Sequence, residues 1–475
     1  MPSVLTQLLR HEDALYVLER IADADCCALV GVSNSGKSSL MRALASRDAR
    51  RQLRSDQAHA DEAVFVYVDF NLMLETTEQG FYELILRSLL DELRCLDGKS
   101  LPKGADAQVI EQLSNAYKML VAPPSHFQIP LSFSEGLTAA CAGLPGGLVL
   151  LFDEFDQPFE QIDERALLNL RAIEDKYHPT LSFVTATDQR LSRIRRGRDV
   201  DEFVELFEPF TRFLGPLTET DLGQVIDSVA QQEGFTFGDE DRAFIQHHAD
   251  GHLGLALAVC RALGEVTGEP VRDTAQNWLI HRQVRDRLDS DLNVQAECRK
   301  LWTDLTAAEQ DTLMALVGSD GEGNLPEPSM IESLQEKGVI HRQKSGAAQG
   351  GQQEEMLLSP VFESFVRRHR LGHRRRDQGV RVDVESGSVW VDGREVPQLT
   401  ELEYRLLLLL YGRLNQICDK YQMVEAVWGE DYIDEVDDAR IDKLLSRLRA
   451  KIEADPSNPR YLTTVRGRGY KLVGP

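Results

Sequence analysis

The sequence predicts a multidomain protein of mixed α/β and α+β class. Its 475 residues are too many for one hydrophobic core, and about 150 residues per domain suggests roughly three domains. Apolar runs rich in β-branched residues alternate with helical patterns up to about residue 218, which is typical of a parallel sheet with helical crossovers. Helical patterns alone follow to about residue 304, and helices mixed with short strands continue from there.

The expected domain boundaries follow these changes of pattern. Residues 1–218 are predicted to form an α/β core and residues 219–304 a helical lid subdomain. The strands expected in the core are Cys26–Val30, Val64–Phe70, Leu148–Phe152, Leu181–Thr185 and Phe210–Leu217. Strands of this kind joined by helical crossovers suit a nucleotide-binding core.

Beyond the lid the pattern changes again. Residues 305–370 contain two helical patterns, a strand, a Gly- and Gln-rich tip and a return strand, which predicts a degenerate winged helix. A helical spacer is the alternative interpretation. Residues 371–379 are short, polar and basic, so we expect an exposed linker there. The last domain is expected at residues 380–475.

The composition excludes several classes of protein. An apolar fraction of 42% with 27% charged residues is typical of a folded protein. No apolar run approaches the roughly 20 residues that cross a bilayer, and the N-terminus lacks the apolar segment of a secretory signal, so no membrane partner is expected. Seven cysteines without CxxC spacing indicate reduced thiols in a cytoplasm rather than disulfides or a structural zinc site.

The distribution of charge points to a local site for nucleic acid. A formal net charge of −24 argues against a protein that coats nucleic acid nonspecifically. Residues 439–475, however, contain nine Lys and Arg against three Asp and Glu. The basic patch is therefore confined to the end of an acidic chain.

A complete phosphate-binding pattern follows the first predicted strand. Residues 31–38 read GVSNSGKS and match GxxxxGK[ST], with a strand before them and a helix after them. Glycines let the backbone N–H groups curl around a phosphate, and the helix N-terminus adds its dipole. Lys37 is expected to reach the β- and γ-phosphates of ATP and Ser38 to ligate Mg²⁺. The predicted nucleotide-binding residues are Gly31, Val32, Ser33, Asn34, Ser35, Gly36, Lys37, Ser38 and Ser39.

Two carboxylates end the third predicted strand. Asp153 and Glu154 follow the apolar run LVLLF. We expect Asp153 to hold Mg²⁺ through water and Glu154 to polarise the attacking water. Acidic residues without a functional role are common at strand ends, but here a complete phosphate-loop motif precedes Asp153 and Glu154 in the sequence.

Two further residues are candidates for sensing the phosphate. The next strand ends in the polar residues Thr185, Thr187 and Asp188. Thr187 is our choice for contacting the γ-phosphate or water, with an ordinary strand-end threonine as the alternative. Arg212 lies near the fifth strand and is a candidate for an arginine that acts across a subunit junction. A surface salt bridge is the favoured alternative for Arg212.

The order of these motifs resembles the AAA+ and STAND classes of P-loop ATPases over about residues 10–300. In those classes a helical subdomain closes on the nucleotide, often through a Gly-x-Pro turn. The comparable GHLGLAL of this sequence carries Leu253 in place of the proline, which leaves open whether Gly251 and His252 touch the nucleotide. The resemblance also implies a following winged helix and a switch between closed and assembled states, so we expect an ATP-dependent homo-oligomer.

The last domain carries several motifs in a fixed order. Alternating strands in RVDVESGSVWVDGREV precede Leu399-Thr400 at a helix start, Trp428-Gly429 at a helix end and Leu448-Arg449 within a third helix. The terminal YLTTVRGRGYKLV is a predicted hairpin. Residues 380–475 thereby resemble the OmpR/PhoB type of winged-helix domain, which implies binding to double-stranded DNA.

The third helix of this domain has an apolar face and a basic face. Lys443, Arg447 and Lys451 project away from the apolar positions and are expected to enter a major groove. The resemblance implies a base contact for Arg447, a second groove contact for Lys443 and a phosphate contact for Arg449. At the wing it implies contacts to phosphate and minor groove, and the residues concerned are Thr464, Arg466 and Arg468.

Two further features of this domain bear on the resemblance. Ala439 stands where the resembled family often has a basic residue that contacts DNA, and Arg440 lies beside it. The acidic run EDYIDEVDD lies at the position of a loop that, in the resembled family, can touch RNA polymerase.

The combined motifs favour an ATP-dependent transcriptional regulator. No phosphoacceptor receiver domain can be read ahead of the DNA-binding module, and an ATPase takes that position. ATP binding would bias oligomerisation or release of the winged helix, and hydrolysis would reset it. Two alternatives remain: a defence or DNA-maintenance ATPase that docks on DNA, and a scaffold that binds nucleotide without hydrolysing it.

Overall fold

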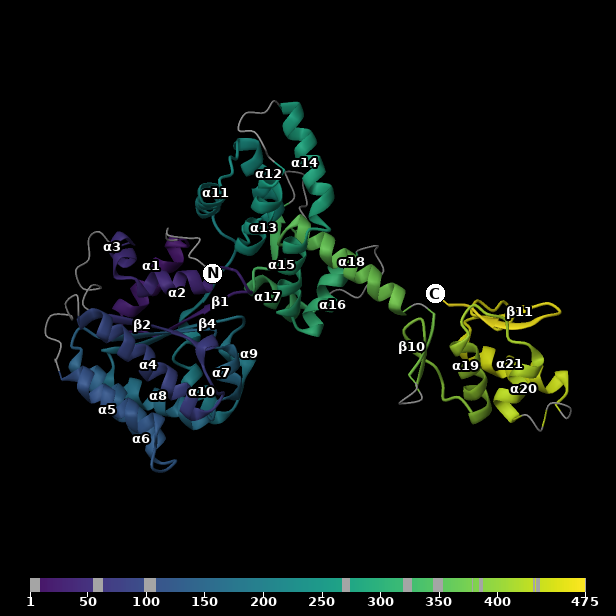
Figure 1. The fold of residues 1–475 in the computed structure, drawn as a ribbon, viewed down its shortest axis with the longest axis horizontal. Helices are drawn as coiled ribbons and strands as arrows, with labels where there is room; N and C mark the ends of the chain where they lie inside the picture. Colours follow the sequence, from purple (N-terminus) through teal and green to yellow (C-terminus); the bar gives the residue numbers. More distant parts are fainter. Residues whose placement is uncertain are drawn as a thin grey trace. The chain divides into compact units, whose positions relative to one another are not determined.

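A computed structural model of the chain describes two compact units, Met1–Val366 and Arg367–Pro475. Figure 1 labels most of their helices and some of their strands. The described residues are 9–53, 63–97, 108–266, 274–318, 327–344, 353–377, 379–383, 388–429, 432 and 436–474.

A five-stranded parallel sheet forms the centre of the first unit, as the sequence predicts. Its strands lie in the order β2-β3-β4-β1-β5, and all four pairings are parallel. β3 and β4 are buried along their whole length, which explains their uninterrupted apolar character. The strands are β1 (Cys27–Val30), β2 (Val64–Asp69), β3 (Leu148–Asp153), β4 (Leu181–Thr187) and β5 (Thr211–Phe213).

The fifth strand is shorter than the predicted range Phe210–Leu217. Residues Glu208–Phe210 form a 3-10 helix instead. The amide of Leu214 still donates to the carbonyl of Val30 at 2.7 Å, but Pro216 has no amide proton for a further ladder bond. The chain therefore leaves the sheet after Leu214.

Helices cover both faces of this sheet. Figure 1 shows α1, α2 and α3 on one side and α4, α5, α6, α8 and α10 on the other. On the first side α2 packs through a core that includes Leu40, Met41 and Leu44, which fixes the helix that follows the phosphate loop. The helices are α1 (His11–Ala22), α2 (Lys37–Ala45), α3 (Arg47–Leu53), α4 (Glu78–Asp97), α5 (Val109–Val121), α6 (Gln128–Gly143), α7 (Asp156–Gln161), α8 (Glu164–Tyr177), α9 (Leu191–Ile194) and α10 (Arg198–Val204).

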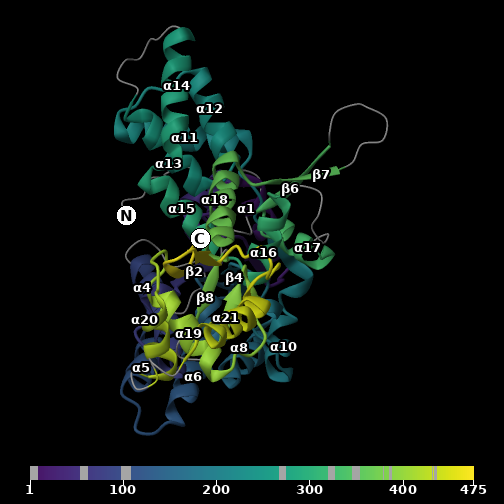
Figure 2. The same cartoon turned by 90° about the vertical axis from the view of Figure 1, so that its right-hand side faces the viewer.

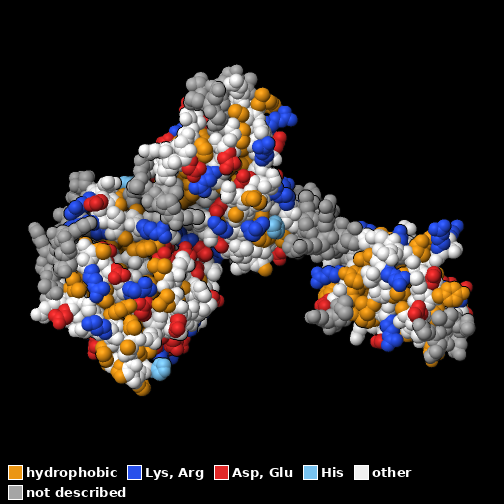
Figure 3. Space-filling view, in the orientation of Figure 1, with side chains coloured by type: hydrophobic (Ala, Val, Ile, Leu, Met, Phe, Trp, Pro, Cys, Tyr) orange, Lys and Arg blue, Asp and Glu red, His pale blue; other side chains and the backbone are white. Residues whose placement is uncertain are grey.

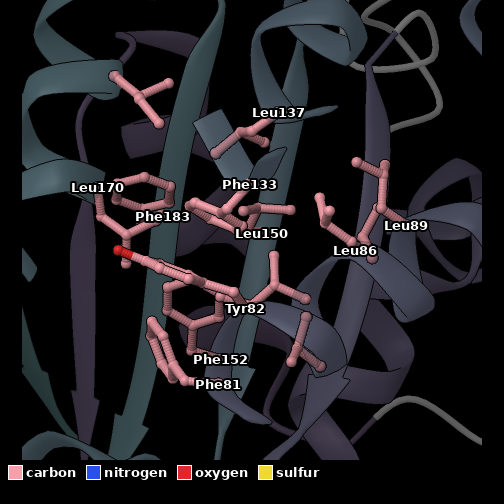
Figure 4. Close-up of a cluster of buried hydrophobic side chains, with 14 of the residues drawn as sticks. Phe81, Tyr82, Leu86, Leu89, Phe133, Leu137, Leu150, Phe152, Leu170 and Phe183 are labelled. Carbon is pink, nitrogen blue, oxygen red and sulfur yellow. The ribbon is translucent and has the colours of Figure 1, made fainter. Parts of the chain in front are cut away.

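An aromatic core fills the second side of the sheet (Figure 4). Tyr82 of α4 stacks on Phe133 of α6 with ring centroids 4.0 Å apart. Phe152 of β3 stacks on Phe183 of β4 at 5.6 Å. Large aromatic side chains bury much apolar area, so this core holds β3 rigidly up to its last residue, Asp153.

The helical lid and the part that follows it share one hydrophobic core. That core includes Val225 and Val259 of the lid together with Leu313, Leu334 and Phe362 of the next part. A shared core makes the two parts one mechanical body, because separating them would expose apolar surface. The lid helices are α11 (Glu219–Glu233), α12 (Asp239–Ala249), α13 (Leu253–Gly264), α14 (Thr274–Leu288) and α15 (Leu292–Thr303).

The next part has the helix, helix and hairpin order that the sequence predicts for residues 305–370. Strands β6 and β7 pair antiparallel, from Ile340 with Leu357 to Lys344 with Gln353, and Figure 2 shows them projecting from the helices. Most of the predicted Gly- and Gln-rich tip lies outside the described residues. The elements are α16 (Ala307–Leu316), α17 (Pro328–Glu336), β6 (Ile340–Lys344), β7 (Gln353–Leu357) and α18 (Pro360–Asp377).

Helix α18 corrects the predicted linker. It extends to Asp377, so most of residues 371–379 are helical. Arginine is a good helix former, and the single Gly372 in this run is tolerated inside a helix. The polar, basic composition that suggested a linker belongs instead to the end of a helix.

Beyond the end of α18, the described residues of the second unit form short antiparallel sheets and three α-helices. β8, β9 and β10 form one sheet, and β11 and β12 form the terminal hairpin. Two of its helices begin with a cap, since Thr400 and Glu403 form a capping box at α19 and Asp437 caps α21. The elements are β8 (Val380–Val382), β9 (Val389–Val391), β10 (Arg394–Glu395), α19 (Glu401–Gly412), α20 (Lys420–Trp428), α21 (Asp438–Ile452), β11 (Leu462–Val465) and β12 (Gly469–Leu472).

Within the described part of the chain, no helix is both long enough and apolar enough to cross a membrane.

Candidate functional site

The phosphate loop joins β1 to α2 and is curled by two residues in the left-handed region. Gly36, the N-cap of α2, has φ of 103°, and Asn34 has φ of 57°. A Cβ at Gly36 would lie 3.3 Å from Nε of Arg10, so position 36 favours glycine on both counts. The amide of Ser35 donates to the carbonyl of Val32 at 3.1 Å. This curl turns backbone N–H groups inward at a helix N-terminus, which is a site for anions.

The ammonium of Lys37 is folded into the loop. Its Nζ donates to the carbonyl oxygens of Gly31 at 2.5 Å and Val32 at 3.2 Å. It also lies 2.6 Å from Oδ1 of Asp188. The lysine side chain is only 7% exposed, so its charge is balanced mainly by Asp188.

Asp188, the residue directly after β4, reaches the lysine, whereas Thr187 at the end of β4 does not. Thr187 is fully buried, and its hydroxyl donates to the carbonyl of Gln189 at 2.8 Å. Successive side chains of a strand point to opposite sides, so the choice between neighbours depends on what lies across the sheet edge. Both residues end the apolar run LSFV, and only the position of Lys37 distinguishes them.

Asp153 lies at the end of β3 and is fully buried. Its Oδ2 accepts a hydrogen bond from the hydroxyl of Tyr67 at 2.6 Å. Its Oδ1 is buried and has no hydrogen-bond partner among the described residues. A buried carboxylate oxygen without a donor is costly, and a hard cation or its bound water would satisfy it. With the hydroxyl of Ser38 at the start of α2, these oxygen donors fit Mg²⁺.

Glu154 follows Asp153 in an unusual backbone conformation. Its φ is 56°, which a glutamate seldom adopts. Desolvation and then the charge of Asp153 raise the pKa of Glu154 above its ordinary value. A carboxylate with a raised pKa beside a phosphate site is suited to accept a proton from water.

A third carboxylate, Asp156, lies beside these two. Its Oδ1 accepts a hydrogen bond from the amide of Asp188 at 2.9 Å. Burial and then the charge of Asp188 raise the pKa of Asp156. The residue follows the strand end by three positions, and no motif marks it. Among the described residues no group of three or more His, Cys, Asp or Glu side chains is arranged to hold a metal ion by itself.

Arg10 supports the phosphate loop from behind and was not predicted. Its guanidinium donates to the carbonyl of Ser35 from Nε at 2.9 Å and Nη2 at 2.6 Å. It also donates to the carbonyl of Gly215 at 2.7 Å and pairs with Asp13 at 3.1 Å. Burial lowers the pKa of Arg10, although Asp13 opposes this shift. Because these contacts join segments that are distant in the sequence, no local sequence pattern predicts the role of Arg10.

His252 of the lid contacts the phosphate loop. Its Nε2 lies 3.1 Å from the carbonyl oxygen of Ser33, and its Nδ1 accepts from the amide of Leu255 at 3.2 Å. The ring therefore carries its proton on Nε2 and donates it to the loop. Burial lowers the pKa of His252 to about 4, so the imidazole is neutral near pH 7. Gly251 takes no part in the hydrogen bonds between His252 and the loop. Its carbonyl oxygen accepts a hydrogen bond from the amide of Leu217 at 2.8 Å.

Two carboxylates of the lid also reach the loop. Oδ2 of Asp304, the C-cap of α15, accepts a hydrogen bond from the amide of Ser33 at 2.7 Å. Glu297 of α15 accepts from the side-chain amide of Asn34 at 2.6 Å. Burial and then the charge of Asp188 raise the pKa of Asp304. The lid therefore lies directly on the phosphate loop.

A small pocket opens behind the loop. Its walls come from the loop, from the N-terminal segment, from the turn after β5 and from the two parts that share a core. Representative lining residues are Arg10, Val32, Pro216, His252, Lys337 and Leu358.

Arg212 forms the salt bridge that we favoured over a role across a subunit junction. Its Nε lies 2.8 Å from Oδ1 of Asp13. Its guanidinium also lies over the ring of Tyr16, 5.5 Å from the centroid. These contacts hold β5 against α1.

The second unit presents a basic surface on α21 and on the terminal hairpin. Lys443 and Arg447 of α21 are exposed, as are Arg466 and Arg468 in the turn between β11 and β12. None of these four forms an ion pair with a described residue. Figure 3 shows Lys and Arg side chains at the end of the second unit where Figure 1 places this hairpin. Four unpaired cations on a helix and a wing can contact DNA phosphates and base edges.

Two other predicted DNA contacts are engaged inside the domain. Nζ of Lys451 donates to the carbonyl of Gln398 at 2.7 Å and to Glu403 at 2.8 Å. Arg449 donates to the carbonyl of Leu462 at 2.9 Å and to the hydroxyl of Thr464 at 2.8 Å. Lys451 thus ties α21 to α19 rather than projecting freely into a groove.

The acidic run before α21 falls mainly outside the described residues, so its suggested contact with RNA polymerase stays a prediction.

Comparison with known families bears on both units. The family described as "Transcriptional regulatory protein, C terminal" matches residues 393–472. The C-terminal domain is an OmpR/PhoB-type winged helix. The family described as "Bacterial TniB protein" matches residues 3–122, which include the phosphate loop. The N-terminal region, with its phosphate loop and parallel sheet, is a P-loop ATPase-like domain.

Curated relatives match part of this chain. Over 95 residues the chain is 44% identical to the sensory transduction protein RegX3 of Mycobacterium tuberculosis, which covers 20% of this chain and 40% of that protein. Over 171 residues it is 32% identical to the uncharacterized transcriptional regulatory protein YcbL of Bacillus subtilis, covering 35% of this chain and 66% of that one. The chain therefore spans only about 40% of the length of RegX3.

Solved structures align with this chain at TM-scores below 0.5 in the two cases that follow. The Walker-type ATPase of Pyrococcus abyssi aligns at 13% identity and a TM-score of 0.48, covering 75% of this chain and 95% of that chain. The DNA-binding domain of Klebsiella pneumoniae RstA, in complex with the RstA box, aligns at 27% identity and a TM-score of 0.18. That alignment covers 20% of this chain and 91% of the RstA chain.

Proposed function

We propose that the protein is an ATP-dependent transcriptional regulator. Binding of ATP and Mg²⁺ at the phosphate loop controls whether the OmpR/PhoB-type domain engages double-stranded DNA. The observation that carries this proposal is the bond from His252 of the lid to the carbonyl of Ser33, because it joins the lid directly to the loop that would take the phosphates. A phosphate entering there changes contacts that the lid makes.

In this proposal, some residues of the site bind the nucleotide and Mg²⁺, and another assists hydrolysis. Lys37 and the curled amides would bind phosphate oxygens. Ser38 and the unpartnered Oδ1 of Asp153 would hold Mg²⁺, which neutralises phosphate charge when bound. Tyr67 keeps the other oxygen of Asp153 engaged and so orients the carboxylate. Glu154 would accept the proton of the attacking water.

The winged-helix-like part is built to transmit changes at this site. Glu336 of α17 pairs with Arg190 at 2.5 Å and with Arg193 at 3.3 Å, and both arginines follow β4 closely. Arg193 also donates to Ser333 of the same helix. With its second helix held on the core, this part acts as a connection rather than as a second DNA reader.

Assembly of several copies follows from the DNA surface. Among the predicted contact residues of one OmpR/PhoB-type domain, only Lys443, Arg447, Arg466 and Arg468 are exposed cations without an ion pair to a described residue, and the chain as a whole has a net charge of −24. Specific affinity needs more phosphate contacts than one such module offers, and paired sites supply them. We therefore propose that ATP favours a homo-oligomer that places two or more of these domains on DNA.

Recovery and sequencing of DNA bound to the full chain, with and without ATP, tests the proposal. We expect an enriched sequence whose recovery depends on ATP and is lost in Lys37→Ala. Equal recovery with and without ATP would overturn the switch. ATP turnover stimulated by DNA of any sequence would favour the DNA-docked ATPase instead.

A further inference from the structure

Two donors of the phosphate loop are already occupied by carboxylates of the protein itself. The amide of Ser33 donates to Asp304 at 2.7 Å, and the ammonium of Lys37 donates to Asp188 at 2.6 Å. In a phosphate loop, backbone amides and the lysine are the groups that bind phosphate oxygens. A carboxylate has the negative charge and the oxygen geometry to take the place of the phosphate oxygens.

The position of Asp304 is imposed by buried neighbours. Its carbonyl oxygen accepts a hydrogen bond from Nζ of Lys337 at 3.1 Å. Lys337 in turn pairs with Glu309 at 2.8 Å, and both side chains are 3% exposed. Buried ion pairs that satisfy each other are costly to break, so the end of α15 is firmly held. Asp304 is therefore presented to the loop by the joint core of lid and winged-helix-like part.

The surroundings of Asp304 identify which phosphate it replaces. Asp188 raises the pKa of Asp304 and Lys37 lowers it, so both charges lie near this carboxyl group. The lysine of a phosphate loop reaches the β- and γ-phosphates, so this corner belongs to the terminal end of the nucleotide. By contrast, no described side chain accepts a hydrogen bond from the amides of residues 37–39. The helix N-terminus is thus open to the inner phosphates while the terminal corner is filled.

We propose that Asp304 is a built-in substitute for the terminal phosphate of a nucleoside triphosphate. This inference rests on the proposed function and specifies its regulation. ADP binds with Asp304 in place, whereas ATP must displace the carboxylate from the amide of Ser33. Because Asp304 belongs to the shared core, its displacement moves the lid and the winged-helix-like part together, away from the phosphate loop.

The decisive experiment compares ATP and ADP affinities of the full chain and its variants. Asp304→Ala is expected to raise the affinity for a nonhydrolysable ATP analogue with Mg²⁺ by about tenfold or more, since a charge-assisted hydrogen bond no longer competes. The affinity for ADP is expected to change by less than about twofold to threefold. Asp311→Ala on α16, an exposed acid with no ion pair to a described residue, is the matched control and is expected to leave both affinities unchanged. Titration calorimetry measures the affinity of each protein for the ATP analogue and for ADP.

The outcomes separate this inference from the proposed function. If wild-type protein binds neither nucleotide, the proposed function fails. If it binds both and Lys37→Ala abolishes binding, but Asp304→Ala leaves the ATP-to-ADP ratio unchanged, only the inference is overturned. An equal gain for both nucleotides would also overturn it. Should Asp304→Ala not fold, Asp304→Asn removes the charge with the same shape and is expected to shift the ratio in the same direction.

Discussion

Lys37 and Asp188 form an ion pair of 2.6 Å across the mouth of the phosphate loop. The two residues are 151 positions apart and end neighbouring parts of the sheet, since β1 leads into the loop and β4 into Asp188. The pair closes the loop on itself, so an incoming phosphate must replace Asp188 as the partner of the lysine.

Removing this lysine is expected to abolish ATP binding. Lys37→Ala deletes the only ammonium that contacts the loop among the described residues, and the remaining amides cannot balance the phosphate charge alone. Titration of the full chain with an ATP analogue measures the loss. Lys118→Ala on the exposed face of α5 is the control, and retained affinity in Lys37→Ala would remove the loop from the nucleotide site.

Glu154→Gln is expected to slow ATP hydrolysis by about a hundredfold or more while ATP binding persists, because a positioned base contributes that much. The raised pKa of Glu154 also predicts that hydrolysis declines on acidification at a higher pH than an ordinary glutamate would allow. Turnover assays across pH check both points, with Glu160→Gln as the exposed control. Wild-type protein that never hydrolyses ATP would favour the scaffold alternative.

Asp156→Asn is expected to flatten the pH dependence of the free energy of unfolding. Burial and then Asp188 raise the pKa of Asp156 above the roughly 3.9 of an unfolded chain. The folded state then holds a proton that the unfolded state has released, so the free energy of unfolding falls as pH rises from about 4 toward neutrality. Denaturation of wild type and variant at several pH values measures the slope. An identical slope in Asp156→Asn, as expected for the exposed control Asp175→Asn, would contradict the prediction.

Arg447→Ala is expected to cost about 1–3 kcal/mol of sequence-specific DNA binding, because the side chain is exposed on α21, the helix that we propose enters the major groove. Binding to the recovered DNA and to an unrelated sequence, at two salt concentrations, separates base contact from phosphate contact. Arg405→Ala on α19, whose side chain pairs with Glu401, serves as the control. An intact footprint with an unchanged salt dependence would show that α21 is not the reading helix.

Lys451→Ala is expected to destabilise the OmpR/PhoB-type domain rather than to weaken its base contacts. Glu403 is 3% exposed, and without the lysine it keeps a buried charge with fewer donors. Leaving such a group underpaired costs about 1–3 kcal/mol of folding free energy. Chemical denaturation measures the loss, and Lys443→Ala, exposed on the same helix, is expected to leave stability unchanged. Normal stability with weakened DNA binding would restore the original assignment of Lys451.

Patterns in neighbouring residues were sufficient to predict the elements of this protein that depend on local sequence alone. The phosphate loop needs glycine at fixed positions between a strand and a helix, and residues 31–38 carry that pattern in one run. The burial of β3 appears as an apolar run that ends in Asp153. The terminal hairpin and the capped helices of the last domain are likewise written in neighbouring residues, so the winged-helix fold was predictable.

Contacts between distant segments were decided only by the tertiary structure. Asp304 reaches Ser33 across 271 positions and His252 reaches it across 219, and neither residue type nor spacing announces such a contact. Helix periodicity directs Lys451 outward, but Glu403 of another helix captures it. The physical reason is common to all of them. A local pattern specifies which face of an element is buried, whereas the partner of a polar side chain depends on which element the fold brings against it.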